Sequence, residues 1–540
     1  MKLRWESFAE FLADRAAAGG DRPAFSLWEE GWRHLSFREV RESAEARARA
    51  LLRSGHRAGD RVAILSPTKL ALTPEILGII LAGAVAVPLD PKLSSAELLA
   101  ILRHVEPRTL IVAEELRALG ADLAAEAGIA KLLFLAEVPA LPFSEASPPA
   151  LPAPSLDDTV AIYYTSGTVG GAKGVMVSAR SILTELTALS GFEENDEDDV
   201  IFSILPLNHL YGFTAGVLYS LACGSEYVFA HSLKPEDITR CLVERRVTQL
   251  NVVPLLLNLM RRGIQARIAE QPAGKRRLVE ICLKMGPFLP VALRRAIFKS
   301  IHEKMGGRLR GAVCGAAPLD PATFQFFNAI GAPIYEGYGL TETGPVVSVN
   351  HPGRAKKGSA GQPLPGVEVK IENPGDDGSG EILTRGPHLM RGYFRDDPLT
   401  REAINEEGWF RTGDLGRLDR GYLRITGRLK GLIVLPSGKK VHAEEVEQAL
   451  SMSRHLQDVC VVGIPTRDHG EMLAAVVFPT EGFGTGEERQ KAVEREVFQA
   501  CRGLAAWKQP QRVIVRDTPF AKTSSGKVKR HLVMSEVRSL

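Results

Sequence analysis

The sequence has few cysteines and no long hydrophobic run. Its 540 residues include six cysteines, and no two of them form a Cys-x-x-Cys pair. This scarcity predicts reduced, mostly buried thiols rather than a disulfide framework. The longest uncharged apolar run, residues 76–89, has 14 residues and is too short to span a bilayer, so we expect a buried helix followed by a strand. The charged N-terminus lacks an apolar signal core, which predicts a cytoplasmic location.

Neither sign of charge is in excess, and several catalytic motifs are missing. Lysine and arginine total 67 against 64 acidic residues, which gives a formal net charge of +3. This balance creates no overall attraction to nucleic acid, and we expect no nucleic-acid partner. The 12 histidines show no metal-binding spacing with cysteine, and no Gly-x-Ser-x-Gly occurs. Hydrolase chemistry is therefore unsupported.

The length accommodates about three or four structural units, at roughly 150 residues per domain. Short Val/Ile/Leu runs such as 61–65 and 109–113 alternate with helical patterns over residues 40–340. This alternation predicts α/β layers with parallel strands. Six prolines in residues 139–154 predict a loop between two subdomains.

The composition changes after residue 353, where glycine and proline become frequent. Apolar and polar residues alternate in 367–371 and 380–384, which predicts a small antiparallel β unit at about 354–426. Farther along the chain, short strands surround helices, and we expect a compact α+β domain of about 110 residues. The predicted boundary separates an N-terminal domain, 1–428, from a C-terminal domain, 429–540.

Two segments concentrate charge. The acidic run 193–199 is most simply a solvated loop, with a metal site as the alternative. Residues 261–310 hold 13 lysines and arginines against three glutamates. Within them, 293–305 has the periodicity of a basic amphipathic helix. Its apolar face is Leu293, Ile297, Phe298, Ile301 and Met305, and its basic face is Arg294, Arg295, Lys299 and Lys304. The apolar stripe either packs on the core, which is the simpler interpretation, or makes a peripheral membrane contact.

The strongest local motif is Tyr164-Thr-Ser-Gly-Thr-Val-Gly-Gly-Ala-Lys-Gly174, directly after an expected strand. Its amides, hydroxyls and lysine could surround a polyphosphate. It is not a Walker A loop, because the Gly-Lys-Ser/Thr ending is missing. Taken alone, the stretch also fits an ordinary flexible loop.

Further segments contain groups suited to nucleotide chemistry, and these are residues 335–343, 408–415, 425–431 and 520–530. In the first, Thr341 offers a hydroxyl and Glu342 the oxygen ligand that a hard cation bridging phosphates needs. Asp414 could accept hydrogen bonds from two ribose hydroxyls. Arg428 could donate a further hydrogen bond to the ribose, and it lies in a segment that could act as a hinge. Taken singly, these segments also fit a capped turn or a basic tail.

In their order and spacing, these five segments resemble the acyl-adenylate-forming family, which includes acyl- and aryl-CoA synthetases, amino-acid adenylation domains and beetle luciferases. The resemblance covers Gly59 to Arg530 and is greatest to bacterial medium- and long-chain fatty acyl-CoA synthetases. It implies a large N-terminal domain of two α/β subdomains plus a small β-barrel, followed by a small mobile α+β domain. It also implies AMP-forming ligation of a carboxylic acid to a thiol, with ATP, Mg²⁺ and coenzyme A.

The resemblance assigns nucleotide-binding roles to individual positions. The ATP phosphates would contact Thr165, Ser166, Gly167, Thr168, Gly170 and Lys173. The adenine slot would consist of Gly315, Ala316, Ala317, Glu336, Gly337 and Tyr338. Thr341 would touch the α-phosphate and Glu342 would hold Mg²⁺, while Asp414 and Arg428 would fix the ribose.

The resemblance also divides the work of the C-terminal domain between two steps. Lys527 would bridge the substrate carboxylate and the α-phosphate during adenylation, a duty suited to a compact charge on a flexible stem. The domain would then turn about Lys430 and bring the loop from Gly438 to Lys440 toward the site, where a thiol attacks the acyl-adenylate.

The acid is indicated by residues 205–212, which match the family's substrate gate, with His209 beside the acyl pocket. No carboxylate lies between Asn208 and Ser220 to balance an α-ammonium group, so amino acids are disfavoured. Residues 344–350 and the basic segment before Gly311 resemble long-chain ligases. We therefore expect a medium- or long-chain fatty acid, with an aryl acid as the next candidate.

Other functions stay open at this point. An acyl-AMP ligase or an acyl-carrier-protein synthetase would share the adenylation step and differ in the acceptor. A nucleotide- or acyl-binding pseudoenzyme and a P-loop-like NTPase are alternatives of another class. The joint presence of Lys173, Glu342, Asp414 and Lys527 argues against an inactive site.

Overall fold

The computed structural model describes residues 2–135, 150–152, 154–166, 172–192, 195–230, 232, 234–437, 439–453, 455–466, 470–480, 482–522 and 528–538. The chain divides into two compact units. The first comprises residues 1–369 and 384–410, and the second comprises 370–383 and 411–540. The domain boundary predicted at 428/429 stays a prediction.

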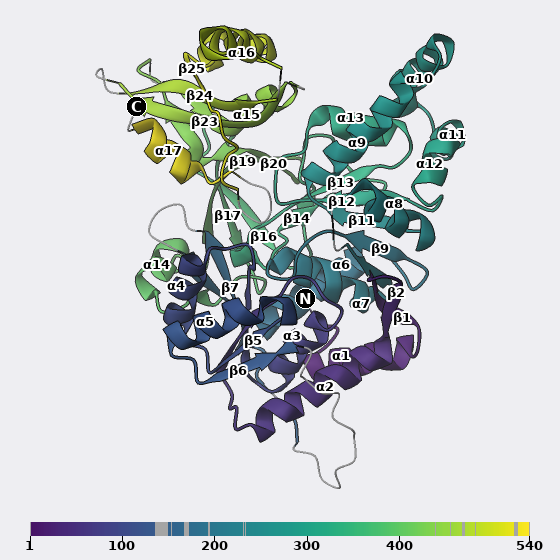
Figure 1. The fold of residues 1–540 in the computed structure, drawn as a ribbon, viewed down its shortest axis with the longest axis vertical. Coiled ribbons are helices and arrows are strands. Elements are labelled where there is room, and N and C mark those ends of the chain that lie inside the picture. Colours follow the sequence, from purple (N-terminus) through teal and green to yellow (C-terminus); the bar gives the residue numbers. More distant parts are fainter. Residues whose placement is uncertain are drawn as a thin grey trace. The chain divides into compact units, whose positions relative to one another are not determined.

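A seven-stranded sheet forms one layer of the first unit, in the order β18-β8-β7-β4-β3-β5-β6 (Figure 1). Its strands are β3 (Arg61–Leu65), β4 (Val85–Leu89), β5 (Thr109–Val112), β6 (Lys131–Phe134), β7 (Thr159–Ser166), β8 (Ala172–Ser178) and β18 (Gly392–Tyr393). Strands β3 to β6 are parallel, whereas β7 and β8 form an antiparallel hairpin. The strands predicted at 61–65 and 109–113 are confirmed.

A nine-stranded sheet forms the second layer, in the order β15-β14-β13-β12-β11-β9-β10-β1-β2. Its strands are β1 (Pro23–Trp28), β2 (Trp32–Ser36), β9 (Val200–Ser203), β10 (Glu226–Phe229), β11 (Gln249–Val252), β12 (Gly311–Cys314), β13 (Ile334–Tyr338), β14 (Ser348–Val349) and β15 (Gln362–Pro363). The six central strands β13, β12, β11, β9, β10 and β1 are parallel to one another. The strands at the two edges, β14 with β15 and β2, pair antiparallel.

Helices cover these two sheets. They are α1 (Phe8–Gly19), α2 (Phe37–Arg53), α3 (Leu72–Leu81), α4 (Ser95–Val105), α5 (Arg117–Ala127), α6 (Ala179–Phe192), α7 (Tyr219–Cys223), α8 (Pro235–Glu244), α9 (Pro254–Ala269), α10 (Ala273–Met285), α11 (Val291–Ile297), α12 (Lys299–Lys304), α13 (Pro321–Ala329) and α14 (Asp397–Ala403). Local sequence fixes several starts, because Ser36 with Glu39 and Ser94 with Glu97 form capping boxes that satisfy the first amides of α2 and α4.

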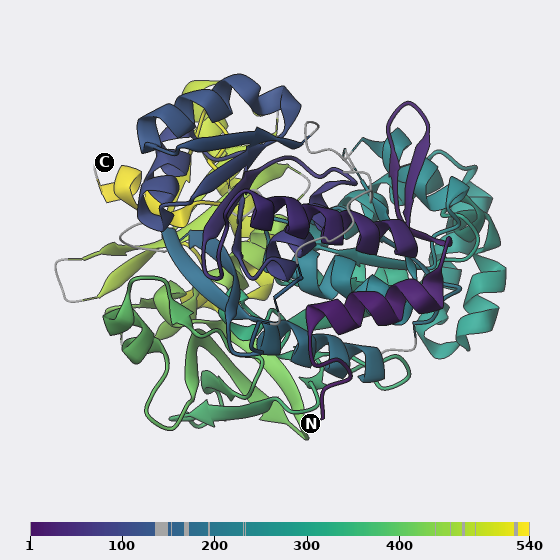
Figure 2. The same cartoon turned by 90° about the horizontal axis from the view of Figure 1, so that it is seen from below.

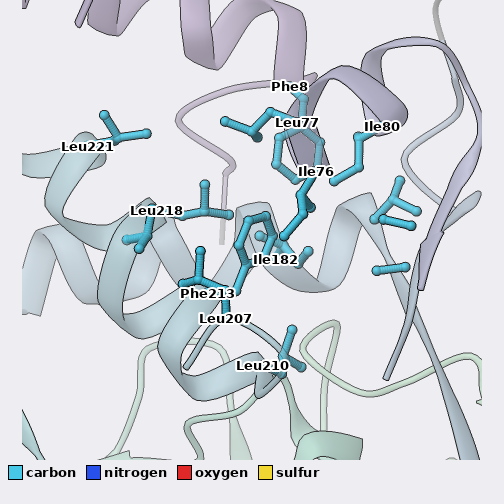
Figure 3. Packing of buried hydrophobic residues seen from close by; sticks show 14 of the residues in the cluster. Phe8, Ile76, Leu77, Ile80, Ile182, Leu207, Leu210, Phe213, Leu218 and Leu221 are labelled. Atoms are coloured by element: carbon cyan, nitrogen blue, oxygen red, sulfur yellow. The ribbon is translucent and has the colours of Figure 1, made fainter. Parts of the chain in front are cut away.

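The largest core cluster contains residues from α1, α3, α6 and the π-helix Gly212–Leu218, as Figure 3 shows. Ile76 and Leu77 of α3 and Phe213 of the π-helix are fully buried there. Helix α3 and β4 together occupy residues 72–89, which confirms the helix and strand expected of the longest apolar run. Helices α1 and α2 pack side by side at the periphery (Figure 1; Figure 2).

The second unit contains the β unit and the α+β elements. A four-stranded sheet has the order β16-β17-β19-β20, where a small β-barrel was expected. Its strands are β16 (Glu368–Glu372), β17 (Gly380–Arg385), β19 (Phe410–Asp419) and β20 (Tyr422–Arg428). They are followed by β21 (Leu432–Val434), β22 (Lys440–His442), α15 (Ala443–Ser451), β23 (Leu456–Pro465), β24 (Glu471–Pro479), α16 (Gly486–Ala500), β25 (Arg512–Val515) and α17 (Arg530–Arg538). The predicted fold class, two α/β subdomains with a β unit and a small α+β domain, is confirmed.

The acidic run 193–199 is not wholly solvated, contrary to the sequence prediction. Asp199 is buried, where it accepts hydrogen bonds from the guanidinium of Arg310 at 2.5 Å and from the hydroxyl of Thr248 at 2.7 Å. The simple interpretation of the run as a surface loop missed these partners, which lie 49 and 111 residues away in sequence. Asp199 thus ties the start of β9 to residues before β11 and β12.

The prediction of a single amphipathic helix at 293–305 is wrong. Two short helices, α11 and α12, meet at Phe298, which is buried with Met305. Arg294 donates to the carbonyls of Leu289 and Asn328, and Arg295 donates to that of Leu309. These two guanidinium groups therefore satisfy backbone carbonyls instead of forming an exposed basic face.

The described parts of the chain include no helix with both the length and the hydropathy needed to cross a membrane.

Candidate active site

The hairpin of β7 and β8 positions the first predicted motif. Thr165 of β7 pairs with Lys173 of β8, so strand pairing fixes the backbone at both of these residues. Lys173 is half-buried, and its Nζ lies 5.2 Å from the ring centroid of Tyr393, within cation–π range. Gly167, Thr168 and Gly170 lie outside the described residues, as does the side chain of Ser166.

Glu342 lies in a short 3-10 turn, Thr341–Thr343, between β13 and β14. The turn closes on itself because the Leu340 amide donates to the Thr343 hydroxyl at 2.8 Å. The Glu342 carbonyl accepts from the Met390 amide at 2.9 Å, and its Oε1 accepts from the Tyr393 hydroxyl at 3.0 Å. These bonds fix both the backbone and the carboxylate of Glu342.

Tyr393 joins two motifs that are separated by more than 160 residues in sequence, and sequence analysis missed it. It lies on β18, which pairs with β8, so its ring contacts Lys173 while its hydroxyl reaches Glu342. Burial, and then the nearby Glu342 carboxylate, raise the pKa of Tyr393, so the hydroxyl keeps its proton and acts as a donor. The only local signal is the preceding Gly392, whose backbone φ of 142° favours glycine over other residues.

The Glu342 carboxylate fits a magnesium site that takes one protein ligand. Oε1 is bonded to Tyr393, and within the described ranges Oε2 has no hydrogen-bond partner. The described residues include no group of three or more His, Cys, Asp or Glu that could hold a metal together. Mg²⁺ is commonly bound by one or two carboxylates with phosphate oxygens and waters. A cation at Glu342 would therefore obtain most of its ligands from a phosphate substrate and water.

The residues expected to form the adenine slot come together at the carboxyl ends of two neighbouring strands. Gly315, Ala316 and Ala317 follow β12, and Glu336, Gly337 and Tyr338 belong to the parallel neighbour β13. Ala316 has a φ of 68°, in the left-handed region that non-glycine residues seldom adopt. Such backbone strain is concentrated at functional sites. In parallel α/β sheets, this end of the strands is the usual location of ligands.

The expected substrate gate lies beside this slot. A Cβ atom built on Gly315 would be 3.6 Å from the Tyr211 hydroxyl and 3.4 Å from the Gly337 carbonyl, so the three segments are in contact. Tyr211 directly precedes the π-helix Gly212–Leu218, a rare element that is frequent at functional sites. Its half-buried neighbour His209 begins this turn, since the Phe213 amide donates to its carbonyl at 3.2 Å.

Glu336 has a raised pKa. Burial raises the pKa of its carboxyl from 4.5 to about 7. Below that pH the folded chain holds a proton that the unfolded chain releases more readily, so stability falls as pH rises from about 4.5 to 7 and is not regained above 7. This carboxyl therefore makes the protein less stable at pH 8 than at pH 5.

A Glu336→Gln variant cannot ionise at this position and should avoid that loss. We expect the thermal midpoint of the variant, relative to the unmodified chain, to be higher at pH 8 than at pH 5, by roughly 1–3 °C. Differential scanning calorimetry at the two pH values measures it. The same difference at both pH values would contradict the assignment.

The second unit brings together the predicted ribose pair. Asp414 of β19 and Arg428 of β20 are register partners, and the Nε of Arg428 lies 2.8 Å from Oδ1 of Asp414. The Asp414 side chain is buried, whereas half of the Arg428 side chain is exposed. Gly413, with a φ of 67°, precedes the carboxylate in a conformation that suits glycine. A buried acceptor with a guanidinium beside it is suited to a diol ligand.

The remaining predicted residues lie largely outside the described part of the chain. Lys527 and Gly438 are outside it, and only the backbones of Lys430 and Lys440 are described. The described residues on either side of 523–527 have defined contacts. Lys522 and Val528 form an isolated β-bridge, and Arg530 donates to Glu447 at 2.8 Å.

Comparisons with known proteins cover nearly the whole chain. A family model described as AMP-binding enzyme matches residues 12–394, and one described as AMP-binding enzyme C-terminal domain matches residues 445–527. A chloroplastic long-chain-fatty-acid–acyl-carrier-protein ligase of Arabidopsis thaliana is 27% identical, over 99% of this chain and 86% of the relative. A sulfoacetate–CoA ligase of Cupriavidus necator is 27% identical over 97% of both chains. Among solved structures, ATP-bound MatB from Rhodopseudomonas palustris has a TM-score of 0.78 at 26% identity, covering 98% of this chain and 99% of that one.

Proposed function

Because this chain belongs to the AMP-binding enzyme family and is an AMP-forming enzyme of the acyl-CoA ligase superfamily, we propose that it activates a fatty acid with ATP and transfers the acyl group to coenzyme A. The family resemblance found in the sequence is thereby confirmed. The observation that supports the adenylation step most directly is the cluster of Lys173, Tyr393 and Glu342. It joins a cation to a fixed carboxylate through one tyrosine.

Adenylation requires charge compensation rather than a general base. A carboxylic acid with a pKa of about 4 is ionised at neutral pH and can attack the α-phosphate directly. The difficulty is repulsion between that carboxylate and three phosphates, which is relieved by cations and donors placed where charge develops. Lys173 would supply one positive charge to the phosphates. Mg²⁺ bound to Glu342 would neutralise further phosphate charge, and Tyr393 would hold that carboxylate in place.

The nucleoside would occupy the strand ends described above. Gly315 to Ala317 and Glu336 to Tyr338 would enclose the adenine, and Thr341 would reach the α-phosphate. Asp414 would accept hydrogen bonds from the ribose hydroxyls, with Arg428 as the second contact. ATP in the related MatB structure supports the use of ATP by this chain.

Replacing Asp414 with asparagine tests the ribose assignment. We expect Asp414→Asn to raise the KM for ATP about tenfold or more, because hydrogen bonds to a charged acceptor are worth about 1.5–3 kcal/mol. Steady-state kinetics with varied ATP measure the effect. Asp419→Asn is the matched control, since Asp419 lies at the other end of the same hairpin in an exposed pair with Arg424. An unchanged KM in the Asp414 variant would refute the ribose role.

A fatty acid is the acid that we propose, in the medium- to long-chain range. The gate segment leads into the π-helix, where Phe213, Val217 and Leu218 are fully buried. No carboxylate lies between Asn208 and Ser220 to bind an α-ammonium group. The fatty-acid ligases of Arabidopsis thaliana and Bacillus subtilis among the relatives support this class. Aryl acids are the second candidate. Small acids are a further alternative, because one relative is a sulfoacetate ligase.

The acceptor is either coenzyme A or the phosphopantetheine arm of a carrier protein. Both present one thiol to the acyl-adenylate, and the relatives include ligases for each. We propose coenzyme A, with the domain turning about Lys430 to bring the Gly438–Lys440 loop toward the thiol. Thioester formation from acyl-AMP, measured with coenzyme A and separately with a carrier protein, distinguishes the two.

ATP–pyrophosphate exchange across acids of graded chain length tests the proposed function. Exchange that depends on the acid and peaks with medium- or long-chain fatty acids is the expected result. A peak with aryl acids or short sulfonated acids would replace fatty acids with that acid as the proposed substrate class. Absence of exchange with every carboxylate tried would favour a nucleotide- or acyl-binding pseudoenzyme.

A further inference from the structure

Helix α10 has an apolar stripe that faces away from the core. Leu278, Ile281, Met285 and, one turn farther, Phe288 follow each other at helical spacing and are 61%, 47%, 54% and 88% exposed. The opposite stripe, Val279, Cys282 and Leu283, packs on the core cluster shared with α13. Because the inner stripe already anchors the helix, the outer one is not needed for folding.

Neighbouring helices extend this surface. Five more exposed apolar side chains lie on the helices before and after α10, and we call them, together with the α10 stripe, the α9–α11 surface. They are Leu255 and Leu259 of α9 and Val291, Leu293 and Ile297 of α11. The α9–α11 surface contains nine of the 17 large hydrophobic residues that are exposed in the described ranges. Scattered exposed leucines are ordinary, but such a concentration marks an interaction site.

Basic side chains surround the apolar ones. Arg262, Arg267, Lys275, Arg277 and Lys284 are exposed, and no acidic partner within the described ranges forms an ion pair with any of them. Only Glu270 and Glu280 contribute negative charge between residues 255 and 297, and Glu280 faces Arg276 at 4.0 Å. The α9–α11 surface is therefore both apolar and strongly positive.

We propose that the α9–α11 surface docks on an anionic lipid bilayer. The combination of large apolar side chains with unpaired basic ones is that of interfacial helices, which bury their apolar face in the headgroup region while the cations contact acidic lipids. Figure 1 shows α10 projecting beyond α9 and α13. Its outward apolar stripe, continued by the nearly fully exposed Phe288 in the 3-10 turn that follows the helix, can enter a bilayer surface without any matching pocket.

Two other occupants fit less well. A second copy of the chain would place one positive surface against another in a symmetric dimer, and like charges in an interface oppose association. An acidic protein would match the charge, yet protein interfaces bury their aromatic anchors in complementary pockets with polar rims. The exposed Phe288 and the other apolar side chains of the same stripe favour the bilayer.

The surface starts close to the candidate active site within the same unit. Helix α9 follows β11 after one residue, and Val252 at the end of β11 is the register partner of Cys314, which precedes Gly315. The α9–α11 surface thus begins on the first turns of a helix that directly follows a strand of the site. This placement goes beyond the proposed function and does not depend on it.

Co-sedimentation of the full chain with vesicles tests the proposal without ATP or any acid, so its outcome is independent of adenylation. We expect binding to phosphatidylcholine vesicles that contain phosphatidylglycerol, and weak binding at high salt or to phosphatidylcholine alone. Ile281→Ser with Phe288→Ser, and separately Lys275→Glu with Arg277→Glu, should each lower the partition coefficient about tenfold or more. Phe498→Ser on α16, an exposed phenylalanine outside the surface, is the matched control and should bind normally.

Phe288→Trp provides a variant that gains rather than loses affinity, because tryptophan favours the membrane interface. We expect it to bind anionic vesicles at least as tightly as the unmodified chain. Absence of binding by the unmodified chain at low salt would overturn the proposal. So would binding of both double variants as tight as that of the unmodified chain. So would a dimer without lipid, or binding of an acidic carrier protein, that the same double variants abolish while vesicle binding is unaffected.

Discussion

Lys527→Ala should abolish formation of the acyl-adenylate while largely sparing the transfer of the acyl group from supplied acyl-AMP to coenzyme A. In the first step the lysine would compensate the charge of both the carboxylate and the α-phosphate as they approach. Loss of one charge placed at a developing transition state costs about 10²–10³-fold or more in rate. In the second step the domain would have turned and removed Lys527 from the site, so its loss should matter little.

Pyrophosphate exchange and thioester formation from synthetic acyl-AMP measure the two steps separately. Lys522→Ala is a matched control, since Lys522 is a lysine five residues before Lys527 whose Nζ binds Asp458 at 2.5 Å within the second unit. We expect that variant to keep most of its exchange activity. Equal loss of both steps in Lys527→Ala would refute the division of labour.

Glu342→Gln should lower adenylation about 100-fold or more and raise the Mg²⁺ concentration needed for half-maximal rate. Glutamine keeps the shape of the side chain but offers a neutral oxygen, which binds a hard cation weakly. Exchange measured over a Mg²⁺ series reports both effects. An unchanged Mg²⁺ dependence would show that the cation is held elsewhere.

Tyr393→Phe separates positioning from cation binding at the same carboxylate. It removes only the hydroxyl that donates to Oε1 of Glu342 and leaves the ring beside Lys173. The loss of one hydrogen bond to a charged group corresponds to about 10–100-fold. We therefore expect a smaller decrease than for Glu342→Gln, with a modest shift in Mg²⁺ dependence. A phenylalanine variant as impaired as Glu342→Gln would point to a direct role of the hydroxyl.

Local patterns predicted the strands well, because a run of β-branched residues flanked by turn residues has few other solutions in a large core. This holds for residues 61–65 and 109–113, and for the alternating strand at 380–384. The proximity of Asp414 and Arg428 also has a local cause, since a hairpin links them. The family motifs then placed Lys173 and Glu342 in one site, although nothing in their spacing requires it.

Contacts between distant residues were beyond sequence reasoning. Tyr393 reaches Glu342 across 51 residues, and the preceding Gly392 is too weak a signal to mark it as part of a site. The periodicity of 293–305 was correct as a pattern, yet the break at Phe298 and the carbonyl partners of Arg294 depend on tertiary packing. The charge of 193–199 likewise indicated solvent exposure, whereas Asp199 is buried and accepts a hydrogen bond from Arg310, which is 111 residues away.

The interruption of the second unit in sequence restricts how this protein can be recombined with its relatives. Residues 370–383 belong to the same compact unit as residues 411–540, although 384–410 lie between them and belong to the other. A crossover at residue 411 would take β19 from one parent and its sheet neighbour β17 from the other. Exchanges of the C-terminal part should therefore succeed more often when residues 370–383 travel with it, or when the crossover lies beyond β20.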